Sequence, residues 1–243
     1  MNFSFFLEIY SPTQNIQPIL NFLISRLKDN FSNIGEIGGV HLYVPHEQNN
    51  IVSEDRNPPK VVFEIISEDI QKLRGCLSLI FKEESVLTGK EVTLKSELFE
   101  RQSFPVQGIC VPSDKQASLS FSVRYYPPIR DIVRFVRYYV ANHPSILAKL
   151  PNIRNIFCYY PKTWKDPWKI KNTNCFLGNE VVFDNMQDLV TANNSEVRQE
   201  LRQDILNSPV KPGPSTHFAY HRIEVHKYLE GDFDETIWEK YLH

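Results

Sequence analysis

The order strand–helix–strand–strand–helix–strand occurs twice along this chain of 243 residues, and it limits the possible folds more than any other feature. Apolar alternation predicts the strands, and apolar residues three or four positions apart predict the helices. In the first copy, the predicted segments are residues 3–10, 16–28, 35–45, 60–67, 70–80 and 91–101. This order is the ferredoxin-like plan, in which helices cover one face of an antiparallel sheet.

The second copy follows a segment of linker character at residues 111–118. Its predicted strands are residues 119–127, 153–160, 175–184 and 216–229, and its predicted helices are residues 129–141, a short helix capped by Asp184 or Asn185, and residues 195–206. A sheet face without helices must still be covered. We therefore predict an α+β fold in which two tandem ferredoxin-like βαββαβ units pack sheet to sheet as an intramolecular dimeric α/β barrel. The units are expected at residues 1–110 and 118–230, with a tail at residues 231–243.

Composition favours an ordinary globular protein. Hydrophobic residues make up 42% of the chain and the net charge is −2, so no basic field indicates a nucleic-acid partner. No stretch of about 20 apolar residues predicts a membrane span, and the N-terminus lacks the basic start of a signal peptide. We expect a soluble, cytoplasmic protein, either a monomer with a pseudo-dimeric barrel or a homodimer.

The four cysteines contain no CxxC pair, which argues against a zinc ribbon. Cys76 and Cys158 fall in apolar stretches and are predicted to be buried thiols. A disulfide scaffold is not expected at this chain length and cysteine density.

His143 is the first candidate for chemistry, in the stretch "NHPSILAKLPNIRNIFCYY". A histidine near a cleft can act as a general base or acid close to neutral pH, for example on a phenol or a β-dicarbonyl. The alternative is structural. His143 would then lie at the C-terminal end of a helix, stabilised by the helix dipole, and Pro144 would stop that helix.

Around His143 the second half resembles the EthD-like family of the dimeric α/β-barrel superfamily. The resemblance rests on His143, on Leu150–Pro151 and on the stretch "EVVFDNMQDL", and it covers about residues 125–226. Two features depart from the family pattern, because Pro144 follows the histidine at once and "KIKNTNCFLG" replaces a "YDG"-like stretch. In the first half only the order of strands and helices matches.

The space between two packed sheets is the natural place for a ligand. Relatives in the wider superfamily include cofactor-independent monooxygenases, cyclases, lyases and isomerases, as well as binding proteins. We therefore expect a protein that binds or transforms a small apolar or aromatic compound, with cofactor-free oxygen or proton-transfer chemistry if it is an enzyme. The alternative is a non-catalytic ligand-binding or structural barrel.

Three more residues are expected to contact such a substrate. Arg124 lies in mid-strand and, pointing between the sheets, would bind a carboxylate or an enolate in a bidentate manner, or would instead pair with Glu180. Tyr159, at the end of a strand, would orient the substrate together with Arg124. Tyr139 lies on the apolar side of the helix that carries His143.

His217 and His221 lie four positions apart on the last predicted strand. At about 3.3 Å per residue they are about 13 Å apart, too far to bind one metal ion, so no metal site is predicted. They are placed among the residues that line the space between the sheets. Trp164 lies in the loop "PKTWKDPWK", where it either closes one end of a ligand cavity or covers the edge of a core.

No cofactor is predicted. The chain has only nine glycines and contains no glycine-rich phosphate loop, no GxSxG and no HExxH. Haem remains an alternative, because a two-repeat barrel can carry it if a histidine is available as axial ligand. His143 or His221 would take that place.

Overall fold

The computed structural model describes residues 2–11, 17–29, 37–80, 92–106, 117–164, 166 and 168–225. The first half contains β1 (Asn2–Tyr10), α1 (Gln17–Asp29), β2 (Gly39–Pro45), α3 (Asn49–Val52), β3 (Val61–Ser67), α4 (Ile70–Ile80) and β4 (Thr93–Phe104). The second half contains β5 (Leu119–Tyr125), α5 (Ile132–Leu147), β6 (Asn155–Pro161), β7 (Lys171–Asn172), β8 (Leu177–Phe183), α6 (Met186–Asn193), α7 (Val197–Asn207) and β9 (Ser215–Glu224). Every predicted strand and helix is present, and α3 and β7 lie between predicted elements.

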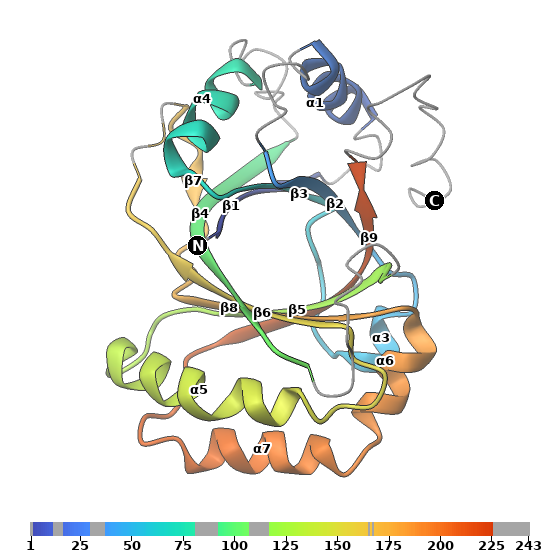
Figure 1. The fold of residues 1–243 in the computed structure, drawn as a ribbon, viewed down its shortest axis with the longest axis vertical. Coiled ribbons are helices and arrows are strands. Elements are labelled where there is room, and N and C mark those ends of the chain that lie inside the picture. Colours follow the sequence, from blue (N-terminus) through green and yellow to red (C-terminus); the bar gives the residue numbers. More distant parts are fainter. Residues whose placement is uncertain are drawn as a thin grey trace.

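Eight strands form one closed antiparallel barrel (Figure 1). Hydrogen-bonded neighbours follow the order β1-β3-β2-β9-β5-β8-β6-β4, and β4 pairs with β1 again to close the circle. Each half keeps the ferredoxin-like order, and the halves join through β2 against β9 and β4 against β6. The predicted intramolecular dimeric α/β barrel is confirmed. The short strand β7 adds to β4 in parallel orientation.

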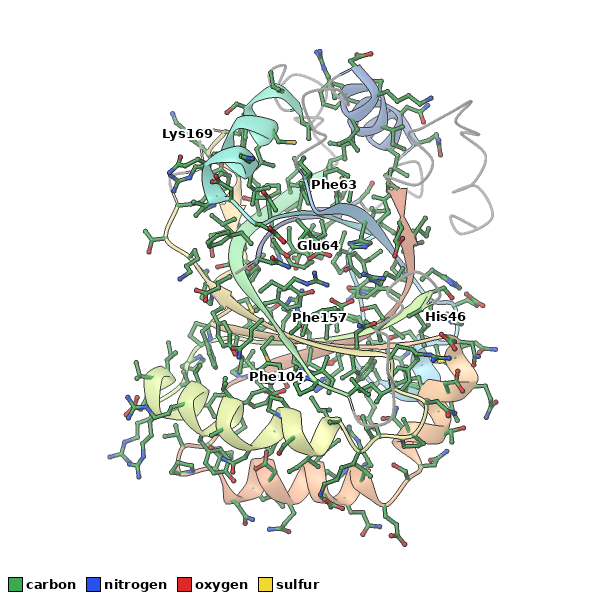
Figure 2. All side chains as sticks on the ribbon, viewed as in Figure 1. His46, Phe63, Glu64, Phe104, Phe157 and Lys169 are labelled. Atoms are coloured by element: carbon green, nitrogen blue, oxygen red, sulfur yellow. The ribbon has the colours of Figure 1, made fainter. Side chains whose placement is uncertain are left out.

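Alternation along the strands divides the buried side chains into an inner set and two outer sets. On β3, Phe63 belongs to the outer core of the first half and the next residue, Glu64, points into the barrel (Figure 2). Phe157 on β6 lies inside the barrel as well. The barrel interior therefore carries both aromatic rings and charged groups, whereas the outer cores are apolar.

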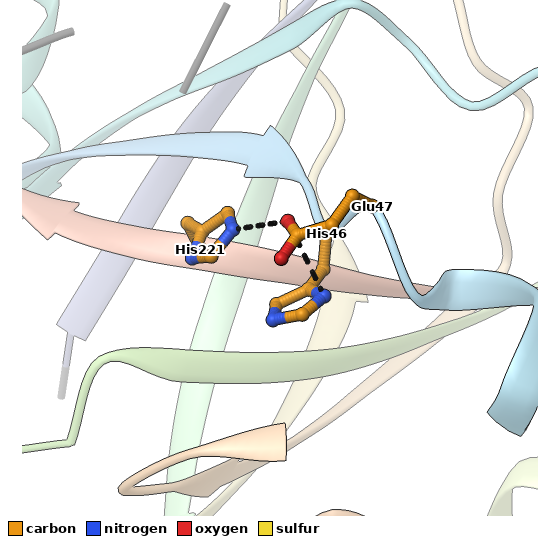
Figure 3. A group of neighbouring side chains, drawn as sticks. All are labelled: His46, Glu47 and His221. Carbon is orange, nitrogen blue, oxygen red and sulfur yellow. Dashed lines mark hydrogen bonds and ion pairs between the residues drawn. The ribbon is translucent and has the colours of Figure 1, made fainter. Parts of the chain in front are cut away.

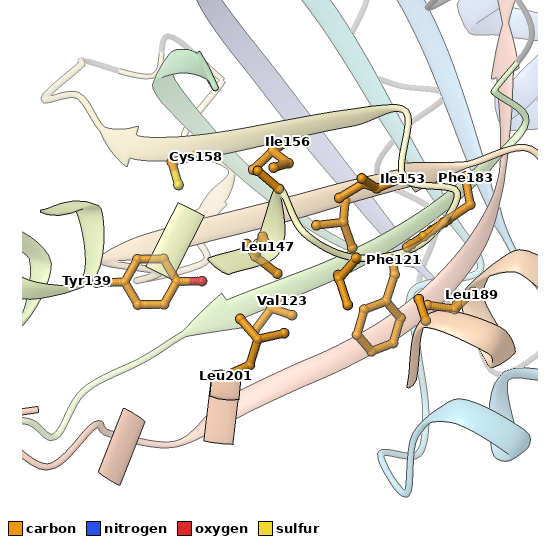
Figure 4. Packing of buried hydrophobic residues seen from close by; sticks show 14 of the residues in the cluster. Phe121, Val123, Tyr139, Leu147, Ile153, Ile156, Cys158, Phe183, Leu189 and Leu201 are labelled. Carbon is orange, nitrogen blue, oxygen red and sulfur yellow. The ribbon is translucent and has the colours of Figure 1, made fainter. Parts of the chain in front are cut away.

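Helices cover only the outer faces of the barrel (Figure 1). Helices α1 and α4 pack on the first half, and α5, α6 and α7 pack on the second half. In the second half, Leu147, Leu189 and Leu201 from the three helices meet Phe121 and Val123 of β5 (Figure 4). Each fully buried side chain of this kind contributes about 1.5–3 kcal/mol to folding.

Helix α5 is longer than the sequence predicts. It runs from Ile132 to Leu147 and contains both His143 and Pro144. Proline removes one backbone hydrogen bond, but the carbonyl oxygen of Pro144 still accepts from the N–H of Ala148 at 3.0 Å, so the helix continues. The expectation that Pro144 stops the helix is wrong, and His143 lies a full turn before the helix end.

Trp164 covers a core edge instead of closing a cavity. Its ring meets that of Phe5 edge to face, with centroids 5.3 Å apart, and it packs on the outer core of the first half. Cys76, Cys158 and Cys175 are buried free thiols, as predicted for the first two.

Several predicted segments fall outside the described residues. These are Cys110, most of the linker, the end of the last predicted strand beyond Val225, and the tail. Within the part of the chain that is described, no helix is long and apolar enough to cross a membrane.

Candidate functional site

A cavity of about 440 Å³ lies between the helices of the second half and the outer face of its sheet. We call it the helix cavity. Its walls come from β5, β8, α5, α6 and α7, and its apolar lining includes Phe121, Val123, Leu147, Leu189 and Leu201 (Figure 4). Pockets for small organic ligands measure roughly 300–1,000 Å³, so the volume suits one such molecule.

His143 and Asp204 form the polar centre of the helix cavity. Helix α5 positions the imidazole and α7 positions the carboxylate, and both residues are 7% exposed. His143 Nδ1 lies 2.7 Å from Asp204 Oδ2, and the Tyr138 hydroxyl donates to Oδ1 at 2.9 Å. Because an ionised carboxylate only accepts, Nδ1 is the donor in this contact, and in the neutral imidazole the lone pair is then on Nε2. Among the described residues no group bonds to Nε2, and the imidazole lines the cavity.

Other polar and aromatic groups surround this pair. The ring of Tyr139 lies against the imidazole, with centroids 4.4 Å apart. Arg198 and Arg202, one helical turn apart on α7, also line the cavity. Burial and the charge of Arg202 lower the pKa of Arg198. His217 on β9 reaches the same cavity, and its Nδ1 bonds to Asp55 Oδ2 at 3.0 Å.

The barrel interior holds a second, separate polar network around Glu64 (Figure 2). The carboxylate accepts from the hydroxyls of Ser4 and Tyr43, both at 2.6 Å, and from Nδ1 of His41 at 3.2 Å. Arg222 donates to Nε2 of His41 at 3.0 Å, and this contact fixes the proton of His41 on Nδ1. The network thus links β1, β2 and β3 of one half to β9 of the other.

Burial and nearby charges set the ionisation states of His41 and Glu64. Burial, together with the charge of Arg222, lowers the pKa of His41 to about 4. Burial alone would raise the pKa of Glu64, but the hydrogen bond from His41 and the charge of Arg101 hold it below its usual range. Glu64 is therefore ionised and His41 neutral at physiological pH.

A cavity of about 360 Å³ lies inside the barrel, and we call it the barrel cavity. Arg124 lines it, with its guanidinium 4.9 Å from the ring centre of Tyr159. The hydroxyl of Tyr159 donates to Glu180 Oε2 at 2.5 Å. The predicted space between the sheets therefore exists, although it lies on the opposite side of the sheet from His143.

His221 belongs to a third group, with His46 and Glu47 (Figure 3). Nε2 of His221 lies 3.0 Å from Glu47 Oε2, and the two imidazoles stack at 4.3 Å with 24° between their planes. One potential ligand atom from each of the three residues lies within 4.8 Å of the other two, and Nδ1 of His46 accepts from the N–H of Gln48. The absence of a metal stays a prediction for this group.

The structure corrects the expectation of one site between the sheets. His143, Tyr139 and His217 line the helix cavity, whereas Arg124 and Tyr159 lie inside the barrel. The cause is strand alternation, since Arg124 and Tyr159 point inward while their neighbours on β5 and β6 point outward.

The remaining predicted site residues are also corrected. His217 and His221 occupy the outer face of β9 instead of the space between the sheets, and they bond to different carboxylates, Asp55 and Glu47. Neither His221 nor Trp164 is in the lining of the helix cavity.

Sequence reasoning missed Asp204, Arg198 and Arg202. All three lie in the polar helix "VRQELRQDILN", where nothing distinguishes them from exposed residues. The only available signal was spacing, because residues 197, 201 and 205 form the apolar face and the neighbouring positions 198, 202 and 204 flank it.

Glu97, on the inner face of β4, gives a prediction about pH. Burial raises the pKa of this carboxyl to about 7, despite hydrogen bonds from Asn172 and from the N–H of Cys175. The folded state thus keeps a proton that the unfolded chain releases near pH 4.3, and stability falls as pH rises towards 7. We expect Glu97→Gln to leave stability unchanged at pH 4 and to raise the melting temperature at pH 8 by on the order of 5 °C.

Thermal unfolding at the two pH values, with Glu54→Gln as control, checks this expectation. Glu54 is exposed, so its substitution should change neither curve. A Glu97→Gln protein with the same pH dependence as the wild type would show that Glu97 is not protonated in the fold.

Comparison with known proteins identifies the fold. No protein-family model and no curated protein matches the chain. A solved anthrone oxidase-like protein matches with a TM-score of 0.56 and 11% identity, over 91% of this chain and 93% of its own. A chlorite dismutase variant from Candidatus Nitrospira defluvii matches with a TM-score of 0.51 and 10% identity, over 100% of this chain and 95% of its own. At these identities the likeness shows the dimeric α/β-barrel fold alone.

A solved EthD-family protein from Bacillus halodurans matches 42% of this chain and 95% of its own, with a TM-score of 0.34 and 17% identity. The barrel fold that the sequence predicts is confirmed by the matches over most of the chain and by the strand order.

Proposed function

We propose that this chain binds a small molecule with an apolar or aromatic body and an acidic hydroxyl in the helix cavity, and that His143 accepts the hydroxyl proton. One observation carries the proposal. A buried carboxylate fixes the proton of His143 on Nδ1, and Nε2 is left without a partner, among the described residues, beside a mostly apolar cavity.

The chemistry follows from that pair. The substrate hydroxyl donates its proton to Nε2, the O–H bond breaks, and the substrate becomes an anion beside an imidazolium. Asp204 stabilises the imidazolium through Nδ1–H and holds the ring in place. In the oxidoreductase form of this proposal the anion transfers one electron to dioxygen without a cofactor. The substrate radical and superoxide then combine through a new C–O bond, and the imidazolium returns its proton to the peroxide formed.

Apolar lining supports a substrate of this class. Phe121, Val123 and Leu201 offer no hydrogen bonds, so a polar ligand would lose its hydration without compensation. Arg198 and Arg202 add positive charge that favours the anion over the neutral hydroxyl. A binding protein without catalysis needs the apolar walls alone. The His143–Asp204 pair and the two arginines in the same lining therefore favour a catalytic role.

Haem is a second candidate ligand for the helix cavity, and the imidazole of His143 favours it. A histidine that binds a metal through one ring nitrogen commonly donates the other N–H to a carboxylate, as His143 does to Asp204. His143 would hold the iron, and Arg198 and Arg202 are the cations available to the carboxylates of haem. Bound haem would supply one-electron and dioxygen chemistry. His221 does not line this cavity and is withdrawn as an axial ligand.

Binding of 1-naphthol tests the first proposal, with 1-methoxynaphthalene as a probe that has the same ring system, one more methyl group and no hydroxyl proton. We expect the wild type to bind naphthol more tightly and partly as naphtholate, which its fluorescence reports. His143→Ala should weaken naphthol binding about tenfold and change methoxynaphthalene binding by less than roughly threefold. His221→Ala, a histidine outside the cavity, serves as the matched control.

Equal binding of naphthol by His143→Ala and wild type would refute the role of His143 as base. Titration with haemin separates the second candidate. A Soret band that appears in wild type and shifts or disappears in His143→Ala would establish haem as the occupant, and haemin with an unchanged spectrum would exclude it.

A further inference from the structure

We infer that the barrel cavity is a second ligand site, separate from the helix cavity, and that it binds a small aromatic carboxylate through Arg124. This inference does not rest on the proposed function. Its basis is the placement of a cation and of an unbonded hydroxyl inside the barrel.

Arg124 forms no salt bridge in the described part of the chain. Burial raises the pKa values of the nearby carboxyls of Glu8 and Glu97, and the charge of Arg124 offsets part of that rise. The guanidinium of Arg124 lies over the rings of Phe6, Phe99 and Tyr159, at 4.9, 5.7 and 4.9 Å from their centres. Its one hydrogen bond reaches the backbone oxygen of Val123 at 3.5 Å, which is long for such a bond. A guanidinium has five N–H donors. Most of the N–H groups of Arg124 therefore remain available to a ligand in the barrel cavity.

A glycine on the neighbouring strand leaves space for the guanidinium of Arg124. Gly178 on β8 is the cross-strand neighbour of both Arg124 and Tyr159. A Cβ atom on Gly178 would lie 2.6 Å from Nη1 of Arg124 and 3.1 Å from Cβ of Tyr159. Glycine weakens a strand interior and often marks a close approach, and here the approaching group is the guanidinium.

A second group points to a ligand. Ser120 is 0% exposed, lines the barrel cavity, and its hydroxyl has no hydrogen-bond partner. An unbonded buried hydroxyl costs about 1–3 kcal/mol, a cost that a polar ligand would remove once the hydroxyl rotates towards the cavity. Ser120 and Arg124 lie on the same inner face of β5, four positions apart.

Charge favours an anion. Among the described residues, three cationic side chains line the cavity, Arg56, Lys95 and Arg124, against two carboxyls, Glu8 and Glu180. Burial raises the pKa of Glu8, which favours its neutral form. The lining therefore has more cationic than anionic side chains, and a carboxylate at Arg124 would balance the difference. Glu180 Oε1 also lacks a hydrogen-bond partner, so the cavity offers one acceptor besides its cations.

The aromatic lining of the barrel cavity favours a ligand with a flat ring. Aromatic rings of Phe6, Tyr43, Phe218 and Tyr220 surround the space, which suits a flat ring. Arginine binds a carboxylate with two parallel hydrogen bonds. A single carboxylate on an aromatic ring satisfies both features, and benzoate is the simplest such probe.

Calorimetric titration of the full chain with benzoate, and with its neutral counterpart benzamide, tests the inference. We expect benzoate to bind and benzamide to bind at least about tenfold more weakly. Arg124→Gln should weaken benzoate binding by about tenfold or more, and Arg124→Lys by less, because lysine keeps the charge but not the paired donors. Arg130→Gln, at an exposed arginine, should bind like the wild type.

Two further measurements keep the inference open to refutation if Arg124→Gln fails to fold. Gly178→Ala should displace the guanidinium and weaken benzoate binding while the charge stays. Saturating 1-naphthol should leave the affinity for benzoate unchanged, since the two cavities lie on opposite sides of the sheet. Benzoate that does not bind, that binds Arg124→Gln and Arg124→Lys equally well, or that competes with naphthol overturns the second site, while the proposed role of His143 would stand or fall by its own titration.

Discussion

Replacement of Glu64 by alanine is expected to lower the free energy of unfolding by about 3–5 kcal/mol, the largest effect that we expect from any single substitution of a charged residue here. The loss is large because the hydrogen-bond donors around Glu64 are buried. Without the carboxylate, the hydroxyls of Ser4 and Tyr43 and the N–H of His41 lose their acceptor inside the barrel. The charge of Arg222, bonded to His41, also loses a compensating anion nearby.

Urea unfolding at pH 7 measures this loss. Glu54→Ala provides the matched control, because Glu54 is exposed and its removal should cost less than about 0.5 kcal/mol. Glu64→Gln should fall between the two, since the amide keeps the shape and one acceptor but not the charge. A loss below about 1 kcal/mol for Glu64→Ala would mean that the network does not hold the two halves together.

Replacement of Asp204 should affect both stability and ligand binding. Asp204→Ala removes the acceptor of His143 Nδ1–H and of the Tyr138 hydroxyl, at a cost of about 1–3 kcal/mol. Asp204→Asn keeps an acceptor oxygen but cannot stabilise an imidazolium by charge. We therefore expect Asp204→Asn to remain folded and to reduce the naphtholate fraction of bound naphthol by about tenfold.

The control for Asp204 lies on the same helix. Glu200 forms an exposed ion pair with Lys149, and Glu200→Ala should cost less than about 1 kcal/mol and leave naphthol binding unchanged. If Asp204→Asn binds naphtholate as the wild type does, the carboxylate has no part in the basicity of His143.

Local patterns were sufficient to predict the barrel. Strand alternation and helical spacing each report which face of an element is buried, and two βαββαβ units in one chain have few ways to cover their bare faces. The end of α5 was not predictable in this way. Pro144 is typical of a helix end, but the turn after it is held by the bond from Ala148 and by packing of Leu147 in the outer core.

The site was predictable only in part. His143 was identified from its place near an apolar turn, and Arg124 from its place in mid-strand. The cavity that each one reaches depends on which side of the sheet the strand turns it to and on how α6 and α7 pack, and neither is visible in a single segment. Asp204 lies 61 residues from His143 in the sequence, and only the packing of α7 against α5 brings them together.

A crystal structure of the protein with 1-naphthol tests the role of His143 in the helix cavity. We predict density for the ring system in this cavity, with the naphthol oxygen about 2.6–3.2 Å from Nε2 of His143 and with the hydrogen bond between Nδ1 and Asp204 retained. Naphthol in the barrel cavity, or in the helix cavity with its oxygen turned away from His143, would contradict it.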